Sequence, residues 1–479
     1  MDFSYKKLLK GTSIYTFSFI FIRAGSILLL PVFTRLLTPS EYGIIGILKP
    51  IINFVPLFFV FGLYVAQMRK YNKYKCNEKK LGNYIFSLNL FLWIINVLLF
   101  LLLISPLGKI LIGKIISYNK VGFYPYVFLA LLVGFLKIFT LMARNYFQTI
   151  HDFNKIAISS IVSFVCSAGF AIILIHYFNL GALGKILGML FGTSIVFSFL
   201  YIGYIKKANF KFNKNMVKES LIIGVPVMAN SIIGIVINYS DRIVLGKFLS
   251  MEVVGIYSLA YTGGMVLLVF TESFLKVWTP MFYDLLDSAN EKKYIIIKKT
   301  FKRFIIISLL LYLFGSLFGK EIIHLCLPQN YNNTYLFLPY ILFAMVFGGI
   351  VHFLGKFFVY FNDTKLIPIF TLISAICNLV INIIFVPIHG AFVAAISTII
   401  SFLITSVIMF IIIEKKYKSV QFDYLKIIFI IFLSFNPITL FLYQSDITLN
   451  NFFLKLLYLI IYLALFFKEI KKIYISLKK

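Results

Sequence analysis

Charged side chains within long apolar segments are the residues of this sequence whose chemistry is most informative. Cations in such segments include Arg23, Lys49, Lys137 and Lys356. A charge at the centre of a lipid bilayer costs roughly 2.5–3.5 kcal/mol even on a lenient insertion scale, so it should face water, a ligand or a counter-ion. Cations lining a cavity suit an anionic ligand such as a diphosphate or an acidic sugar, because they donate charge-assisted hydrogen bonds to phosphate. These four residues are the candidates for substrate binding.

The carboxylates point to a second role. Within residues 1–205 every acid lies outside the apolar segments: Asp2, Glu41, Glu78 and Asp152. Glu272 is the only carboxylate that lies more than two residues inside an expected apolar segment. Lys276 follows it at a spacing that permits a pair on one helix face, and Asp241 lies at the outer edge of another segment. These three residues are candidates for ion coupling, with a proton or sodium as the ion. For Lys276 and Lys356, a side chain that reaches the cytoplasmic interface is the competing interpretation.

The segments that position these charges make up most of the chain. Of its 479 residues, 61% are hydrophobic and 13% are charged, whereas a soluble protein has about 25% charged residues. Runs of about 20 apolar residues suit helices that cross a hydrocarbon core of about 30 Å. We expect an all-α polytopic membrane protein with about 14 spans, or 12 if the last two are not membrane helices. The expected spans are 13–34, 43–67, 84–106, 121–143, 156–177, 183–205, 218–240, 253–276, 303–322, 334–358, 366–386, 390–413, 426–443 and 451–467.

The distribution of Lys and Arg predicts the orientation of these spans. With the N-terminus inside, the cytoplasmic segments hold 33 of these residues and the outer loops hold 8. This bias follows the positive-inside rule and predicts that both termini are cytoplasmic. It also accounts for most of the net charge of +29, which favours contact with anionic lipids over nucleic-acid binding.

Enzyme chemistry has little support in the sequence. We find no nucleophile–base pair, glycine-rich phosphate loop, carboxylate pair or cluster of metal ligands, and we expect no cofactor. The four cysteines show no disulfide or metal-site spacing. The longest outer loops, 107–120 and 323–333, are short and contain no acid. These features argue against a membrane polysaccharide polymerase or glycosyltransferase.

An internal repeat relates the two halves of the chain. The elbow "RLLTPSEYGIIGI" aligns with "KFLSMEVVGIYSL" when Gly43 is placed opposite Gly255, a spacing of 212 residues. Two further pairs of segments match at similar spacings. Because each copy holds six spans, we expect two parallel repeats related by an axis along the membrane normal. The expected parts are an N-terminal lobe (1–205), a basic linker (206–217), a C-terminal lobe (218–413), and an extra helix pair with a basic tail (414–479).

The elbow itself should be a tight turn between the first two spans. Pro39 and Gly43 are expected to break the helix there, and Thr38 or Ser40 could cap the exposed amides of the next helix. Arg35 should lie at the level of the outer headgroups.

The stretch "PVFTRLLTPSEYGIIG" resembles the signature of the polysaccharide-transporter family, part of the multidrug/oligosaccharidyl-lipid/polysaccharide (MOP) exporter superfamily. The resemblance implies two six-helix lobes that form a V around a central cavity. It implies a flippase in the bacterial inner membrane that moves undecaprenyl-diphosphate-linked oligosaccharides, such as O-antigen or capsule repeat units. The implied partners are this lipid-linked oligosaccharide, membrane lipids, and a polymerase or other polysaccharide-assembly proteins.

Two other transport functions remain open. One is a flippase for the lipid-linked peptidoglycan precursor, and the other is an ion-coupled multidrug exporter. An exporter of cationic drugs should carry a buried carboxylate in its N-terminal half, where this sequence places cations.

Overall fold

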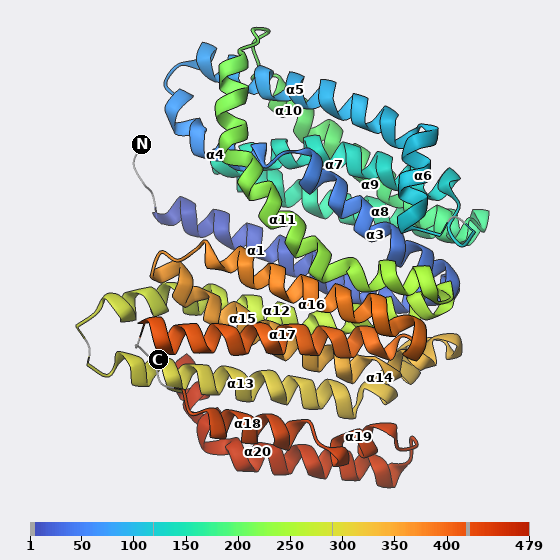
Figure 1. The fold of residues 1–479 in the computed structure, drawn as a ribbon, viewed down its shortest axis with the longest axis vertical. Coiled ribbons are helices and arrows are strands. Elements are labelled where there is room, and N and C mark those ends of the chain that lie inside the picture. The colour runs from blue at the N-terminus through green and yellow to red at the C-terminus, as the bar shows by residue number, and fades with distance from the viewer. Residues whose placement is uncertain (1–4, 118, 290, 418–421, 479) are drawn as a thin grey trace. The chain divides into compact units, whose positions relative to one another are not determined.

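The computed structural model describes residues 5–117, 119–289, 291–417 and 422–478. Throughout these residues the secondary structure is helical, and they contain no strand (Figure 1). Within the described residues, fourteen helical segments are long and apolar enough to cross a membrane. The expectation of an all-α polytopic membrane protein with fourteen spans is confirmed.

The chain divides into two units, residues 1–255 and 256–479. The first unit contains α1 (Tyr5–Leu28), α2 (Leu30–Leu36), α3 (Pro39–Phe59), α4 (Leu63–Tyr74), α5 (Glu78–Ile104), α6 (Pro106–Ile115), η1 (Phe123–Val127), α7 (Phe128–Thr149), α8 (Phe153–Phe178), α9 (Gly181–Val196), η2 (Phe197–Tyr201), α10 (Ile202–Ile205) and α11 (Lys214–Phe248). α12 (Met251–Asp287) begins in the first unit and continues in the second. The second unit also contains α13 (Lys293–Leu317), α14 (Gly319–Cys326), η3 (Gln329–Leu336), α15 (Leu338–Tyr360), α16 (Leu366–His389), α17 (Phe392–Ile412), η4 (Ile413–Tyr417), α18 (Tyr424–Ser434), α19 (Pro437–Gln444) and α20 (Leu449–Lys478).

α11 follows the expected linker between the lobes, yet it packs within the first unit against α3, α4 and α5. Lys70 of α4 forms an ion pair with Glu219 of α11 at 2.6 Å. The hydroxyl groups of Tyr84 in α5 and Ser220 in α11 lie 3.0 Å apart, within hydrogen-bond distance. The two units are defined by packing and not by the repeat, so the six-helix lobes stay a prediction.

The second expected span is two helices separated by a short break. Gly62 joins α3 to α4 with a φ of +65°, a backbone conformation that glycine adopts without a steric penalty. A Cβ at this position would lie 2.0 Å from the carbonyl oxygen of Gly224 in α11. Asn96 of α5 donates a hydrogen bond to the carbonyl of Phe59 at 3.1 Å. A side chain thus satisfies a carbonyl at the break, as helix breaks at membrane depth require.

The elbow between the first two spans is built as a helix start. Thr38 is the N-cap of α3: its side chain accepts a hydrogen bond from the backbone N–H of Glu41, and the Glu41 carboxylate accepts one from the backbone N–H of Thr38. Pro39 occupies the first helical position, where its missing N–H is not needed. Of the two residues expected to cap this helix, Thr38 is the one that does so. The prediction that Gly43 breaks the helix is wrong, because Gly43 lies within α3.

Gly43 instead permits a close contact between the two aligned elbows. A Cβ on Gly43 would lie 1.9 Å from the carbonyl oxygen of Met251, and a Cβ on Gly255 would lie 1.9 Å from that of Pro39. Met251 and Pro39 are themselves separated by 212 residues, as Gly43 and Gly255 are. The contact is therefore reciprocal, as expected for two repeats that meet about a twofold axis. Only glycine allows the backbones to approach so closely.

The C-terminal helices α18, α19 and α20 pack on α13 of the second unit (Figure 1). The ammonium group of Lys455 in α20 is fully buried and lies 2.6 Å from the carboxylate of Glu321 in α14. Lys320 donates a hydrogen bond to the carbonyl of Ser445 at 2.9 Å. These two polar contacts join the extra helix pair to α14 in the rest of the unit.

The reciprocal glycine contact predicts a stability effect. Gly43→Ala or Gly255→Ala would place a methyl group against a backbone oxygen, so we expect a loss of about 1–3 kcal/mol in the free energy of unfolding. Gly169→Ala in α8 is the matched control, because nothing lies within 4 Å of its added Cβ. That substitution should stabilise the helix or leave it unchanged. Thermal unfolding of the purified proteins in detergent would measure both, and equal midpoints for Gly43→Ala and Gly169→Ala would contradict the prediction.

Candidate functional site

A pocket of about 480 Å³ opens within the first unit among α3, α7, α8, α9 and α11. Its described lining includes two cations and no carboxylate. The rest of the lining is a mixture of polar and apolar side chains. The lining residues are Asn53, Pro56, Leu57, Lys137, Thr140, Leu141, Arg144, Ser163, Thr193, Val196, Ile235 and Tyr239.

Lys137 of α7 is held in this pocket by a chain of polar contacts. Its ammonium group lies 3.5 Å from the side-chain oxygen of Asn53 in α3, and the Asn53 amide donates a hydrogen bond to the Tyr239 hydroxyl in α11 at 2.9 Å. Among the residues that the structure describes, no carboxylate lies within ion-pair distance of Lys137. Because the Tyr239 hydroxyl accepts from Asn53, its own proton is available to a ligand. Lys137 and Tyr239 can therefore both donate hydrogen bonds to an anion.

Arg144 brings a second cation to the same pocket. It lies two helical turns after Lys137, and side chains at this spacing share one face of a helix. Its guanidinium group donates a hydrogen bond to the Ser160 hydroxyl in α8 at 2.8 Å, which fixes its position. The span expected here ends at residue 143, whereas α7 continues to Thr149 and so contains Arg144. Its seven-residue spacing from Lys137 is the signal that could have identified it.

Lys49 belongs to a neighbouring group of cations. Its ammonium group lies 5.9 Å from the ring centroid of Tyr42, and it is close enough to Arg242 and Lys185 for mutual repulsion. Asp241 lies beside Arg242 in α11 and is fully buried. The span expected to end at residue 240 continues to Phe248, so Asp241 lies within the helix. α11 thus brings a buried carboxylate into the unit that contains the N-terminal cations.

Arg23 lies apart from the pocket lining. It is half-buried in α1, which packs on α8, and its guanidinium carbon is 5.2 Å from the ring centroid of Phe19. Three cations predicted to bind one substrate therefore lie at different places in the first unit. Lys137 lines the pocket, Lys49 belongs to the neighbouring group, and Arg23 lies on another helix.

The remaining predicted site residues lie in the second unit. Glu272 and Lys276 are exposed on α12, and Lys356 is half-buried on α15. His352, one turn before Lys356, interacts electrostatically with both Glu272 and Lys356. Ring contacts between the two helices, such as Phe274 with Phe353, bring these residues together. His352 was not among the predicted site residues, although its spacing of four residues from Lys356 places both side chains on one helix face.

Comparison with known proteins assigns the family. Residues 8–286, more than half of the chain, match the family described as "Polysaccharide biosynthesis protein". The chain belongs to this family. No curated protein sequence matches it.

Several solved structures resemble this member of the family. The lipid II flippase MurJ in an inward closed conformation matches with a TM-score of 0.72 and 15% identity, over 95% of this chain and 99% of that chain. An inward-facing multidrug resistance MATE transporter of the MOP superfamily matches with a TM-score of 0.66 and 14% identity, over 83% and 99%. The MATE transporter VcmN of Vibrio cholerae matches with a TM-score of 0.53 and 13% identity, over 86% and 97%. At these identities the similarity shows a shared fold.

The contact between Lys137 and Asn53 predicts energetic coupling between the two residues. Asn53→Leu removes the oxygen beside the Lys137 ammonium group, so we expect it to lower the free energy of unfolding by about 1–3 kcal/mol. Lys137→Met should be neutral or stabilising, because it removes a buried charge. In the double variant the Asn53 substitution should cost at least about 0.5 kcal/mol less than it does alone. A double-mutant cycle in detergent measures this coupling, and strictly additive effects would show that Asn53 does not hold Lys137.

Proposed function

We propose that this protein is a flippase that moves an undecaprenyl-diphosphate-linked oligosaccharide, such as an O-antigen or capsule repeat unit, across the bacterial inner membrane. Membership of the polysaccharide biosynthesis family and the shared fold with membrane transporters support this function. The observation that carries the proposal is the pocket of the first unit. Lys137 and Arg144 both belong to its described lining, which contains no carboxylate.

The chemistry of this pocket matches a diphosphate headgroup. Two cations and the hydroxyl of Tyr239 offer several hydrogen-bond donors within one cavity, and phosphate oxygens accept such bonds strongly. The hydroxyl and amide groups of Thr140, Ser163, Thr193 and Asn53 supply both donors and acceptors, as sugar hydroxyl groups require. At about 480 Å³ the cavity can enclose the diphosphate and the first sugar, and the prenyl chain stays in the lipid.

A flippase for the lipid-linked peptidoglycan precursor is the second candidate. The lipid II flippase MurJ shares the fold over 95% of this chain, and its cargo, as its name states, is another lipid-linked molecule. A drug exporter fits less well, because the cationic lining of the pocket would repel a cationic drug. The buried Asp241 is the residue that such an exporter would use.

The proposed transport cycle is alternating access without a chemical step. The headgroup enters from the cytoplasmic side and contacts Lys137 and Arg144, and Lys49 and Arg23 interact with it along its path. Lys356 of the second unit contributes a further positive charge. Relative movement of the two repeats then exposes the headgroup on the other side. In this proposal both termini are cytoplasmic, and a polymerase or another assembly protein receives the product.

Export and abundance measured in the same cells would test the proposed function. Lys137→Met and Arg144→Gln should each lower exported polysaccharide about tenfold or more, because each removes a charge-assisted hydrogen bond to the cargo. Membrane abundance should stay at the wild-type level, and the lipid-linked precursor should accumulate on the inner leaflet. Lys211→Met, in the exposed linker, is the control and should export normally. Normal export by a variant that lacks both pocket cations would contradict the proposal.

Arg23 provides a separate arm of the same assay. If the cargo contacts Arg23 along its path, Arg23→Ala should accumulate in the membrane at least as well as wild type and lose export. Arg23→Lys should keep part of the activity, because an ammonium group cannot reproduce the two-pronged grip of a guanidinium group on phosphate. Arg23→Glu should be inactive. Loss of the protein in Arg23→Ala would give Arg23 a structural role and leave the role of the pocket unchanged.

Glu272 is the proposed site of ion coupling, together with Lys276, and Asp241 is the alternative. Glu272→Gln keeps the shape of the side chain and removes its titration, so we expect a lower flipping rate and a weaker dependence on pH or sodium. Flipping by reconstituted protein across imposed proton and sodium gradients measures both. A normal rate with unchanged pH and sodium dependence would eliminate Glu272, and the same assay on Asp241→Asn would test the alternative.

A further inference from the structure

A second charged pocket lies in the other unit, where α18 and α20 meet α13. It has a volume of about 320 Å³. Its polar lining consists of four lysines and two carboxylates, which gives a net charge of +2: Lys298, Lys299, Lys302, Lys426, Asp423 and Glu469. Apolar side chains complete the wall: Ile295, Phe301, Phe422 and Ile427.

Each carboxylate of this pocket is shared between two cations. Asp423 lies 2.7 Å from Lys298 and 3.5 Å from Lys426. Glu469 lies 3.3 Å from Lys302 and 3.5 Å from Arg303. The hydrogen bond from Lys298 holds the pKa of Asp423 below its usual range, so this carboxylate is ionised at neutral pH. The ion pairs therefore do not neutralise the cluster, and an excess of positive charge remains to attract an anion.

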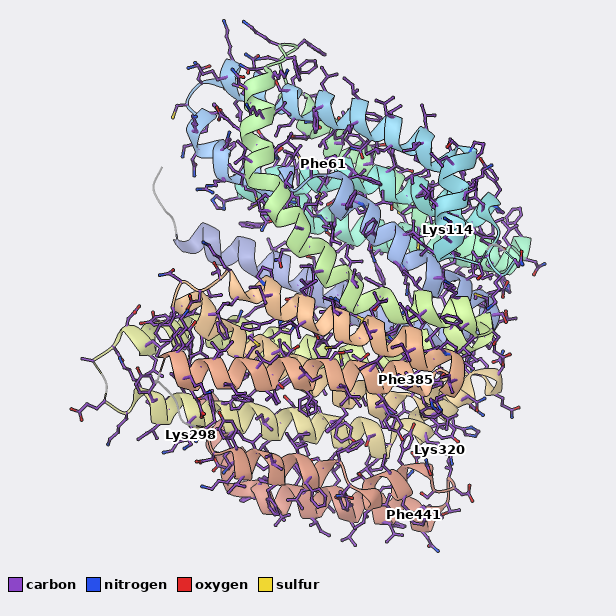
Figure 2. All side chains as sticks on the ribbon, in the orientation of Figure 1. Phe61, Lys114, Lys298, Lys320, Phe385 and Phe441 are labelled. Atoms are coloured by element: carbon purple, nitrogen blue, oxygen red, sulfur yellow. The ribbon has the colours of Figure 1, made fainter. Side chains whose placement is uncertain are left out.

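The position of the pocket determines which anions can reach it. Figure 2 shows Lys298 and Lys320 at opposite ends of the second unit. The distribution of Lys and Arg predicts that the end with Lys298 faces the cytoplasm. Beside the pocket, α18 carries three apolar side chains that are 59–85% exposed: Leu425, Ile428 and Phe429. A ligand with a phosphate group and acyl chains would satisfy both the cations and this apolar surface.

We propose that this pocket binds the phosphate of an anionic glycerophospholipid from the inner leaflet, and that the bound lipid strengthens the attachment of α18 and α20 to α13. The phosphate would contact Lys299 and Lys426, and the acyl chains would lie along the apolar surface of α18. A soluble phosphate ester offers the same headgroup chemistry but cannot use that surface. The site lies within the second unit and is independent of the cargo pocket in the first.

Lipid binding to the purified full-length protein in neutral detergent would test this proposal. Native mass spectrometry would compare retention of phosphatidylglycerol with that of phosphatidylcholine, and titration would give apparent Kd values. Wild type should prefer phosphatidylglycerol, and Lys299→Gln with Lys426→Gln should weaken its binding about tenfold or more. Asp423→Asn should strengthen binding, because it removes a negative charge from the pocket. Lys211→Gln, outside the pocket, should bind as wild type does.

Two controls separate this lipid site from simpler explanations. In detergent micelles that contain phosphatidylcholine the double lysine variant should unfold at the wild-type temperature, and only the stabilisation given by phosphatidylglycerol should be lost. The soluble headgroup sn-glycerol 1-phosphate should not displace the lipid at equal concentration. Unchanged phosphatidylglycerol binding by the double variant would overturn the proposal. Equally tight binding of sn-glycerol 1-phosphate would overturn the assignment to a lipid.

Discussion

The cationic pocket depends on how the charge of Lys137 is accommodated within a membrane helix. An ammonium group at this depth is stable only when polar groups or water replace its hydration shell. α3 supplies Asn53, and α11 supplies Tyr239, so two neighbouring helices support one charge from α7. Arg144 obtains similar support from Ser160 of α8. Asn53 and Tyr239 also line the cavity, so for Lys137 the requirements for stability and for ligand binding converge on the same side chains.

Close backbone contacts at glycines hold α3 and α11 against their neighbours. At the elbow, the reciprocal contact between Gly43 and Gly255 joins the start of α3 to the start of α12. At the break in the second span, Gly62 and Gly224 let α11 approach the junction of α3 and α4. Both contacts require glycine because a Cβ would meet a backbone oxygen. The packing of α3 and α11, which both line the pocket, thus depends on glycines that lie outside it.

Much of the fold could be predicted from the sequence, because hydrophobic runs, loop charges and an internal repeat can be recognised without knowledge of tertiary contacts. The fourteen spans, a cap at Thr38 or Ser40, and the equivalence of Gly43 and Gly255 follow from such patterns. The site could be predicted only in part. Lys137 was found by its apolar surroundings, whereas Arg144 was missed because the end of α7 was placed six residues too early. The packing of α11 in the first unit, with the buried Asp241, depends on tertiary contacts that no local pattern encodes.

We propose that the cationic pocket recognises the negative charge of the cargo headgroup. The most direct test of this recognition uses purified protein in proteoliposomes and two cargoes that carry the same sugars on the same prenyl chain. One cargo has a diphosphate linkage and the other a neutral linkage of similar length. We expect the protein to flip the diphosphate cargo at least about tenfold faster, since charge-assisted hydrogen bonds to two cations are lost with the neutral one. Equal flipping rates for the two cargoes would contradict the account.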